Sequence, residues 1–206
     1  MHLSRLILVF GLVITAFVGG TLFMTLAFQG PRDQPQHATI LPQAGTLPQF
    51  SLLDQDGAEF NNESLHGQWS LLFFGFTHCP DICPATLQQL AIARSRVLQQ
   101  GAADFPNIVL ISVDPERDTP DVMAEYIAHF GDGVTGVTGS LTELRTLTAA
   151  LGIYFEKSDE DNGDYTVGHS AAVIVINKNA KFHALFSAPH NIDHFVGDIA
   201  LIMESS

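Results

Sequence analysis

Cys79 and Cys83 are the only cysteines among the 206 residues, and they lie four residues apart. A disulfide between them would close a loop too short to restrain the unfolded chain, so their role is chemical rather than structural. Two thiolates one helical turn apart can converge on a single small ion. Soft thiolates prefer Cu(I), with zinc as the main competitor. The pair therefore indicates a metal or redox site, and a metal would need at least one further ligand.

The local setting of the two cysteines favours such chemistry. Residues 70–76 (SLLFFGF) form an uninterrupted apolar run that predicts a buried strand, and a helix is expected to begin at Pro84. The cysteines therefore lie at the carboxyl end of a strand and at the start of a helix. Active sites of open α/β sheets favour this edge, and helix amino-terminal amides lower the pKa of a thiol.

A third ligand must come from one of nine histidines. Five have no ligand-like sequence context and are expected in surface or core roles: His2, His37, His66, His129 and His183. His78 adjoins Cys79, but its side chain is expected to point elsewhere. His190 and His194 have the i, i+4 spacing of a helical chelate without a third partner nearby.

His169 has a different sequence context. It follows an acidic stretch, residues 157–164, that we expect to be flexible, and it precedes an apolar strand expected over residues 171–177. In a thioredoxin-like fold the turn before that strand packs against the cysteine turn, and disulfide oxidoreductases of this fold place a cis-proline there. Here the turn is Gly168-His169-Ser170. An imidazole at this position would face the two sulfurs and complete a Cys₂His set suited to copper.

The remaining pattern predicts an α/β fold, with a thioredoxin-like, mostly parallel central sheet flanked by helices. Further elements are expected as a strand at 107–113, helices at 120–130 and 140–151, a hairpin of strands 171–177 and 181–187, and a helix at 191–203. Thr119 is expected to cap the first of these helices, and Ser140 with Glu143 to form a capping box for the second.

The amino-terminal part predicts a membrane anchor. Residues 6–28 are uncharged and apolar over a length that spans a bilayer, with Arg5 on the expected cytoplasmic side. A cleaved signal peptide, with a small-residue site at 25–27, is the alternative. We expect residues 1–28 to form the anchor, 29–49 a linker and 50–206 the folded domain. The net charge of −13 disfavours nucleic-acid binding.

Three stretches of the chain resemble the Sco (SenC) family of copper-binding proteins. The stretches are FGFTHCPDICP at 74–84, ISVDPERDTP at 111–120 and DYTVGHS at 164–170. The resemblance implies a thioredoxin-like domain on one transmembrane anchor, with Cu(I) or Cu(II) held by Cys79, Cys83 and His169. The chain departs from the family pattern at Gly168, where the family commonly has an acidic residue. That residue belongs to the surface expected to face the partner, so the glycine concerns which oxidase the chain would recognise.

The family implies a function in cytochrome c oxidase assembly. The expected partners are subunit II of the oxidase or another copper-receiving oxidase subunit, a copper donor protein and a thiol reductant. The expected location is the bacterial inner membrane with the domain in the periplasm, or alternatively the mitochondrial inner membrane facing the intermembrane space. We expect a metallochaperone of this kind to act as a carrier and not as an enzyme, with thiol-disulfide reductase activity as the alternative.

Two other functions use the same cysteines. The first is a membrane-anchored thiol-disulfide oxidoreductase with Cys79 and Cys83 as its redox pair, although such enzymes favour two intervening residues and need no histidine. The second is a peroxidase of the peroxiredoxin type, which is disfavoured because Thr77 lies two residues before Cys79 instead of three. Residues 159–164 (DEDNGD) lack the glycine position and the final glutamate of an EF-hand calcium loop.

Overall fold

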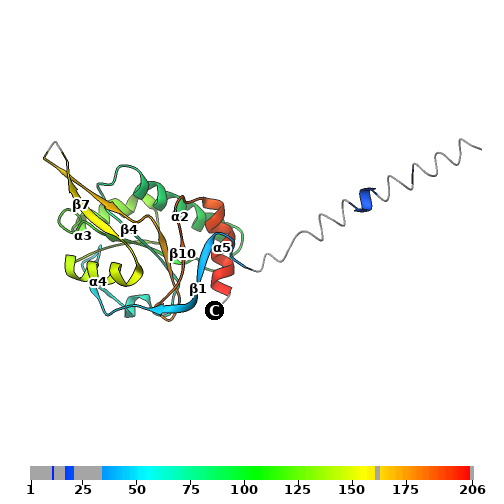
Figure 1. Ribbon diagram of the computed structural model, residues 1–206, viewed down its shortest axis with the longest axis horizontal. Coiled ribbons are helices and arrows are strands. Elements are labelled where there is room, and N and C mark those ends of the chain that lie inside the picture. The colour runs from blue at the N-terminus through cyan, green and yellow to red at the C-terminus, as the bar shows by residue number, and fades with distance from the viewer. Residues whose placement is uncertain (1–10, 12–16, 21–33, 161–162, 205–206) are drawn as a thin grey trace, which may run out of the picture. The chain divides into compact units, whose positions relative to one another are not determined.

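The computed structural model describes residues 11, 17–20, 34–160 and 163–204, and it divides into two compact units, Met1–Gln34 and Pro35–Ser206 (Figure 1). Of the predicted anchor at 6–28, only residues 11 and 17–20 are described, and these are helical. The rest of that prediction lies outside the described residues. Within the described residues, no helix is long and apolar enough to cross a membrane.

A mixed eight-stranded sheet forms the centre of the second unit, with the strand order β1-β10-β9-β4-β5-β6-β2-β3. Its strands are β1 (Ala38–Thr46), β2 (Ser51–Asp54), β3 (Glu59–Asn61), β4 (Ser70–Gly75), β5 (Asn107–Ser112), β6 (Val134–Thr138), β9 (Val173–Ile176) and β10 (Lys181–Phe186). Every residue of β4 is buried, as its apolar run predicts.

The expectation of a mostly parallel sheet is wrong. Only the pairs β4–β5 and β5–β6 are parallel, whereas β9 runs antiparallel to β4 and β10 antiparallel to β9. The short turn between β9 and β10 reverses the chain, and a hairpin requires antiparallel neighbours. The strand β6 was not predicted, because its sequence VTGVT lacks a continuous apolar run.

Four α-helices lie within the described residues 34–160 and 163–204: α2 (Ile82–Gln99), α3 (Pro120–Ile127), α4 (Leu141–Leu151) and α5 (Ile192–Glu204), with 3₁₀ turns η1 (Glu63–Leu65) and η2 (Ala128–Phe130). Thr119 and Ser140 accept the expected capping hydrogen bonds. Glu143 departs from a full capping box, because its carboxylate accepts a hydrogen bond from the amide of Ser51 instead. Helix α2 begins two residues before the predicted Pro84, and it packs beside α5 (Figure 1).

Part of the predicted linker belongs to the sheet. Strand β1 pairs with β10 in the register Ala38↔Phe186 and Thr39↔Leu185, with an irregularity between Ile40 and Gly45. Its sequence, ATILPQAGT, contains proline and glycine and does not alternate, so it gave no strand signal. Proline is tolerated because β1 is an edge strand and the proline needs no amide donor there.

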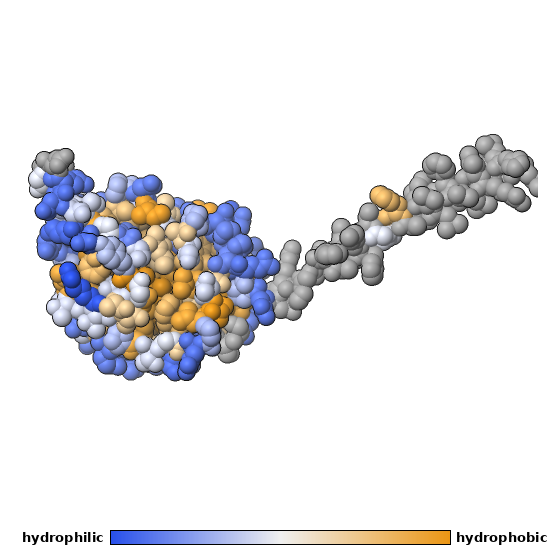
Figure 2. Space-filling view, viewed as in Figure 1, coloured by the Kyte–Doolittle hydropathy of each residue, from blue (hydrophilic) through white to orange (hydrophobic). Residues whose placement is uncertain are grey.

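Part of the stretch predicted to be flexible, residues 157–164, lies in a β-hairpin, because residues 157–159 belong to its first strand. Strand β7 (Phe155–Asp159) pairs antiparallel with β8 (Tyr165–His169), placing Phe155 opposite His169. Charged and polar side chains occupy most of β7 and are exposed, which made the segment resemble a loop in sequence. Figure 2 shows the hairpin as hydrophilic on the face in view, in contrast to the apolar area between α4 and β1.

A buried carboxylate ties the start of β1 to α5. Asp198 is 3% exposed and accepts hydrogen bonds from the backbone amides of His37 at 2.6 Å and Ala38 at 2.8 Å. These charge-assisted contacts attach the first strand of the domain to its last helix. They are made at the amino-terminal end of that strand.

Replacing Asp198 with alanine should lower the free energy of unfolding by about 1–3 kcal/mol, because two backbone donors lose their acceptor. Equilibrium urea denaturation followed by the fluorescence of the single tryptophan, Trp69, measures the change. Asp193→Ala is the matched control on the same helix, since the carboxylate of Asp193 is 80% exposed in its ion pair with Arg96. Equal effects of the two substitutions would contradict the prediction.

Candidate metal centre

The turn between β4 and α2 presents both cysteines at the carboxyl edge of the central strand. Cys83 is fully buried in the first turn of α2, and Cys79 precedes the helix and is 9% exposed. The amide of Cys79 donates to the carbonyl of Phe76, and the amide of Cys83 donates to Cys79 Sγ at 3.4 Å. The helix amino terminus therefore directs a backbone donor at the Cys79 sulfur, as the sequence predicts.

Glycine is required at the end of β4 because a sulfur lies against it. A Cβ on Gly75 would lie 2.9 Å from Cys83 Sγ and 3.1 Å from the ring of Phe73. Any other residue would therefore require the Cys83 sulfur or the Phe73 ring to move. The small residue lets Cys83 pack directly on the sheet.

His169 lies next to the cysteine pair although it is 86 residues further along the chain than Cys83. Its Nε2 lies 3.2 Å from Cys83 Sγ, and its Nδ1 lies 3.1 Å from the carbonyl oxygen of Ser170. A carbonyl can only accept a hydrogen bond, so Nδ1 carries a proton, and in the neutral imidazole Nε2 is the nitrogen that can bind a metal ion. The ligand atoms of Cys79, Cys83 and His169 all lie within 4.8 Å of one another.

Two phenylalanine rings form a wall beside the imidazole. Phe73 and Phe76 meet His169 edge to face, with ring centroids 6.1 Å and 5.8 Å from the imidazole centroid. Both phenylalanines are buried in the core. This wall limits the rotation of the imidazole and keeps water from its buried side, which favours a fixed ligand geometry.

The two cysteines differ in acidity because one thiol donates to the other sulfur. The hydrogen bond from Cys83 is the main cause that lowers the pKa of Cys79 to about 4, against the opposing effect of burial. The same hydrogen bond, together with burial, raises the pKa of Cys83 well above that of an ordinary thiol. At neutral pH the pair therefore holds a thiolate on Cys79 and a thiol on Cys83.

Asp118 positions the turn that carries Cys79, and its role was missed in the sequence. This carboxylate is fully buried and accepts hydrogen bonds from the Thr77 amide at 3.1 Å, the Thr77 hydroxyl at 2.6 Å and the Ser112 hydroxyl at 2.6 Å. It thereby joins the loop after β5 to the residues just before Cys79. The one sequence signal was its place in the stretch ISVDPERDTP, which did not reveal its partners.

The other histidines lie in different surroundings. His190 and His194, whose spacing is that of a helical chelate, contact different groups. His190 Nε2 lies 2.6 Å from the Ala171 carbonyl oxygen, whereas the ring of His194 stacks on that of His37. His78 is exposed, with its Nδ1 3.0 Å from the Thr77 hydroxyl. Within the described residues, only Cys79, Cys83 and His169 form a group of three that could hold a metal ion.

Gly168 is not required by the backbone. Its φ lies outside the left-handed region, and a Cβ there would meet only the Glu156 carbonyl oxygen, at 3.9 Å. A Cβ therefore fits at this position without moving the hairpin. The glycine leaves out the negative charge that an acidic side chain would add beside His169.

Comparison with known proteins identifies similar chains. A model of the SCO1/SenC family matches residues 39–204. The mitochondrial SCO1 homolog 1 of Arabidopsis thaliana is 38% identical over 144 residues, which cover 70% of this chain and 43% of that protein. A SCO2-like protein of Rickettsia prowazekii is 32% identical over 193 residues, covering 88% of each. The crystal structure of Arabidopsis thaliana ScoI with copper bound is 35% identical, with a TM-score of 0.72, and the match covers 78% of this chain and 99% of that chain.

The acidity difference predicts selective alkylation of the reduced, metal-free chain. Iodoacetamide should modify Cys79 first, at a rate that changes little between about pH 6 and pH 8, because a thiol with a pKa of about 4 is already ionised there. An ordinary thiol would instead react about tenfold faster for each pH unit in this range. Peptide mass spectrometry measures both rates.

Cys83→Ala is the control for this prediction, because it removes the hydrogen-bond donor. The alkylation rate of Cys79 should then fall at the acidic end of the range. A parent chain in which Cys83 reacts first, or in which the Cys79 rate follows the pH dependence of an ordinary thiol, would contradict the assignment.

Proposed function

The chain belongs to the SCO1/SenC family, and on this basis we propose that it is a metallochaperone that binds copper through Cys79, Cys83 and His169 and delivers it to cytochrome c oxidase. The proposed receiver is the copper centre of subunit II or another copper-receiving oxidase subunit. A copper donor protein and a thiol reductant would act before it.

One observation carries the proposal: two sulfurs and an imidazole nitrogen lie within 4.8 Å of one another beside an apolar wall. Thiolates suit Cu(I), and an imidazole adds a ligand that Cu(II) also accepts. A structural zinc site would instead be expected to have four protein ligands. The copper-bound ScoI of Arabidopsis thaliana, which matches most of this chain, supports copper as the ion.

The mechanism is ligand exchange at a reduced cysteine pair. Cys79 offers its thiolate first, and Cys83 gives up its proton as its sulfur joins, so each copper ion bound releases one proton. The helix amide on Cys79 Sγ and the carbonyl on His169 Nδ1 hold two of the ligands in place. On delivery, the ligands of the acceptor displace these side chains one at a time, and Cys83 takes up a proton again. A disulfide has no thiolate to offer, so reduction must come first.

A second candidate function is thiol-disulfide exchange, favoured by the low pKa of Cys79. The Cys79 thiolate would attack a partner disulfide to form a mixed disulfide and release one partner thiolate. Cys83 would then lose its proton and displace the second partner sulfur, leaving a Cys79–Cys83 disulfide and a reduced partner. This chemistry gives no role to His169, which separates it from copper delivery.

Copper binding should depend on all three side chains. Cys79→Ser and Cys83→Ser should abolish tight Cu(I) binding, and His169→Ala should weaken Cu(II) binding about 10–100-fold or more, because each removes a ligand. Stoichiometry and competition titrations with chromophoric chelators measure these effects on the reduced chain. His129→Ala removes an exposed imidazole remote in sequence and should leave both affinities unchanged.

The two candidate functions give opposite results in these measurements. If His169→Ala binds both copper ions as tightly as the parent, the third ligand is wrong. If the copper-free chain reduces protein disulfides rapidly, and His169→Ala does so equally well, thiol-disulfide exchange is the main function.

The amino-terminal residues 6–28 are proposed to anchor the domain in a membrane, with residues 29–37 as the connection to β1. The domain would face the periplasm of a bacterium, or the intermembrane space of a mitochondrion in the alternative. The length and apolarity of residues 6–28 support this proposal.

Membrane anchoring predicts that the expressed chain resists extraction with alkaline carbonate, whereas a chain without residues 6–28 is released to the supernatant. Immunoblotting of the two fractions measures the outcome. Fusion of a reporter that is active only outside the cytoplasm tests the orientation. Release of the intact chain by carbonate, or a shortened product that begins after residue 27, would contradict the uncleaved anchor.

A further inference from the structure

A network of polar contacts joins the loop after β5 to the start of β8. Arg117 Nε donates to Asp114 Oδ2 at 2.5 Å, and Arg117 Nη1 donates to the carbonyl oxygen of Tyr165 at 3.1 Å. The Tyr165 hydroxyl donates to Asp114 Oδ1 at 2.8 Å, and the guanidinium carbon of Arg117 lies 3.8 Å from the centroid of the Tyr165 ring. We call Asp114, Arg117 and Tyr165 the hairpin clamp.

The hairpin clamp is shielded from water. The side chains of Asp114 and Arg117 are 4% and 18% exposed. Burial and the hydrogen bond to Asp114 raise the pKa of Tyr165 to about 12, so the phenol keeps the proton that it donates. Charge-assisted hydrogen bonds in such surroundings are stronger than exposed ion pairs. The clamp is therefore a firm attachment for the hairpin.

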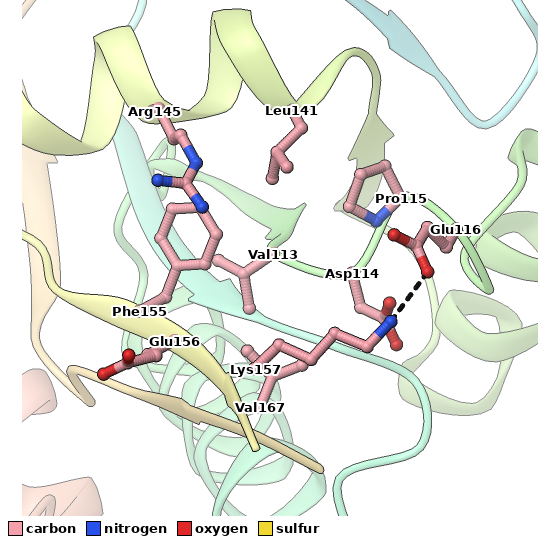
Figure 3. A pocket seen from close by; sticks show the side chains of 10 residues that line it. All are labelled: Val113, Asp114, Pro115, Glu116, Leu141, Arg145, Phe155, Glu156, Lys157 and Val167. Carbon is pink, nitrogen blue, oxygen red and sulfur yellow. Dashed lines mark hydrogen bonds and ion pairs between the residues drawn. The ribbon is translucent and has the colours of Figure 1, made fainter. Parts of the chain in front are cut away.

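Packing elsewhere under the hairpin is incomplete. A cavity of about 300 Å³ lies between α4, the loop after β5 and the inner side of the β7–β8 hairpin. Figure 3 shows Arg145 of α4 directed toward Phe155 of the hairpin, while the side chain of Lys157 extends toward Glu116. Lys157 forms an ion pair with Glu116 at 2.9 Å, but both side chains are largely exposed. Val167 of β8 packs in the core beside this cavity, and the hairpin clamp supplies the buried polar attachment of the hairpin.

One member of the hairpin clamp, Tyr165, lies on the strand that carries the histidine. Tyr165, Val167 and His169 alternate along β8 and share one side of it, because side chains two apart point the same way. The guanidinium of Arg117 also lies 5.8 Å from the ring of Phe76, and Phe76 borders His169. Arg117 therefore contacts both the strand of His169 and the wall beside its imidazole.

We infer that the hairpin clamp positions His169, so that it governs the affinity of the site for Cu(II) while leaving its affinity for Cu(I) nearly unchanged. Cu(I) is held by the two thiolates, which the β4–α2 turn positions without the hairpin. Cu(II) prefers nitrogen and oxygen ligands and so depends on the imidazole. The inference rests on the proposed copper function and assigns Arg117 as a positioning residue.

The test compares the full-length reduced chain with its Arg117→Met variant. Competition titrations should show Cu(II) affinity about 10–100-fold lower in the variant, as for other residues that hold a ligand in place. Cu(I) affinity should stay within about threefold of the parent, because both thiolates remain. Electron paramagnetic resonance of the Cu(II) form should show weaker nitrogen hyperfine coupling, a signature that a loss of stability alone would not produce.

Two further variants sharpen the comparison. Lys157→Met is the charge-matched control, since Lys157 lies 3.6 Å from the same Tyr165 ring but its ion pair is exposed, and it should leave both affinities unchanged. Tyr165→Phe keeps the ring and removes only the hydroxyl that Asp114 accepts. It should lower Cu(II) affinity about two- to tenfold, and it tests the inference even if Arg117→Met does not fold.

The outcomes separate the two proposals. Unchanged Cu(II) affinity in Tyr165→Phe and Arg117→Met overturns the positioning role, as does an equal loss of Cu(I) and Cu(II) affinity. An equal loss in Lys157→Met also overturns it, because net charge would then be the cause. If the parent itself binds neither copper ion, the proposed function fails before the hairpin clamp is tested.

Discussion

The contact of 3.2 Å between Cys83 Sγ and His169 Nε2 is the constraint on which the arrangement of the site depends. It joins the first turn of α2 to the last residue of β8, and each side is fixed by a different kind of interaction. Close packing fixes the cysteine side, since Gly75 admits the sulfur against the sheet. On the histidine side, the hairpin borders a cavity and is held by the polar contacts of Arg117 as well as by the buried Val167. The two ligand sources can therefore respond independently to substitution.

Local sequence patterns were sufficient for the cysteine half of the site. The apolar run of β4, the proline in the first turn of α2 and the cysteine spacing each act over a few residues. The structure has the predicted strand and helix, although the helix begins at Ile82 and not at Pro84. The proximity of His169 required more, namely the topology of a thioredoxin-like fold and the resemblance of the surrounding stretch to a known family. No local pattern around residue 169 indicates which turn it will meet.

The missed features depend on tertiary context. Strand β1 pairs at a sheet edge, where proline and glycine are tolerated, and β7 is mostly exposed, so neither has the apolar periodicity from which strands are predicted. Asp118 and Arg117 have an ordinary loop sequence. Their roles come from Thr77, 41 residues earlier, and Tyr165, 48 residues later. A pairing at such separation leaves no trace in one sequence.

Charge explains why the metal-free site is stable and yet ready for a cation. A fully buried carboxylate, Asp118, lies near the cysteines, and its charge adds to the effects that raise the pKa of Cys83. Three hydrogen bonds stabilise the negative charge of Asp118. The hydrogen bond from the Cys83 thiol stabilises the negative charge of the Cys79 thiolate. A cation that bound both sulfurs would replace the Cys83 proton and offset the added negative charge in the same apolar surroundings. The proton on Cys83 therefore occupies the place that the proposed function gives to copper, and metal affinity must fall as the pH falls.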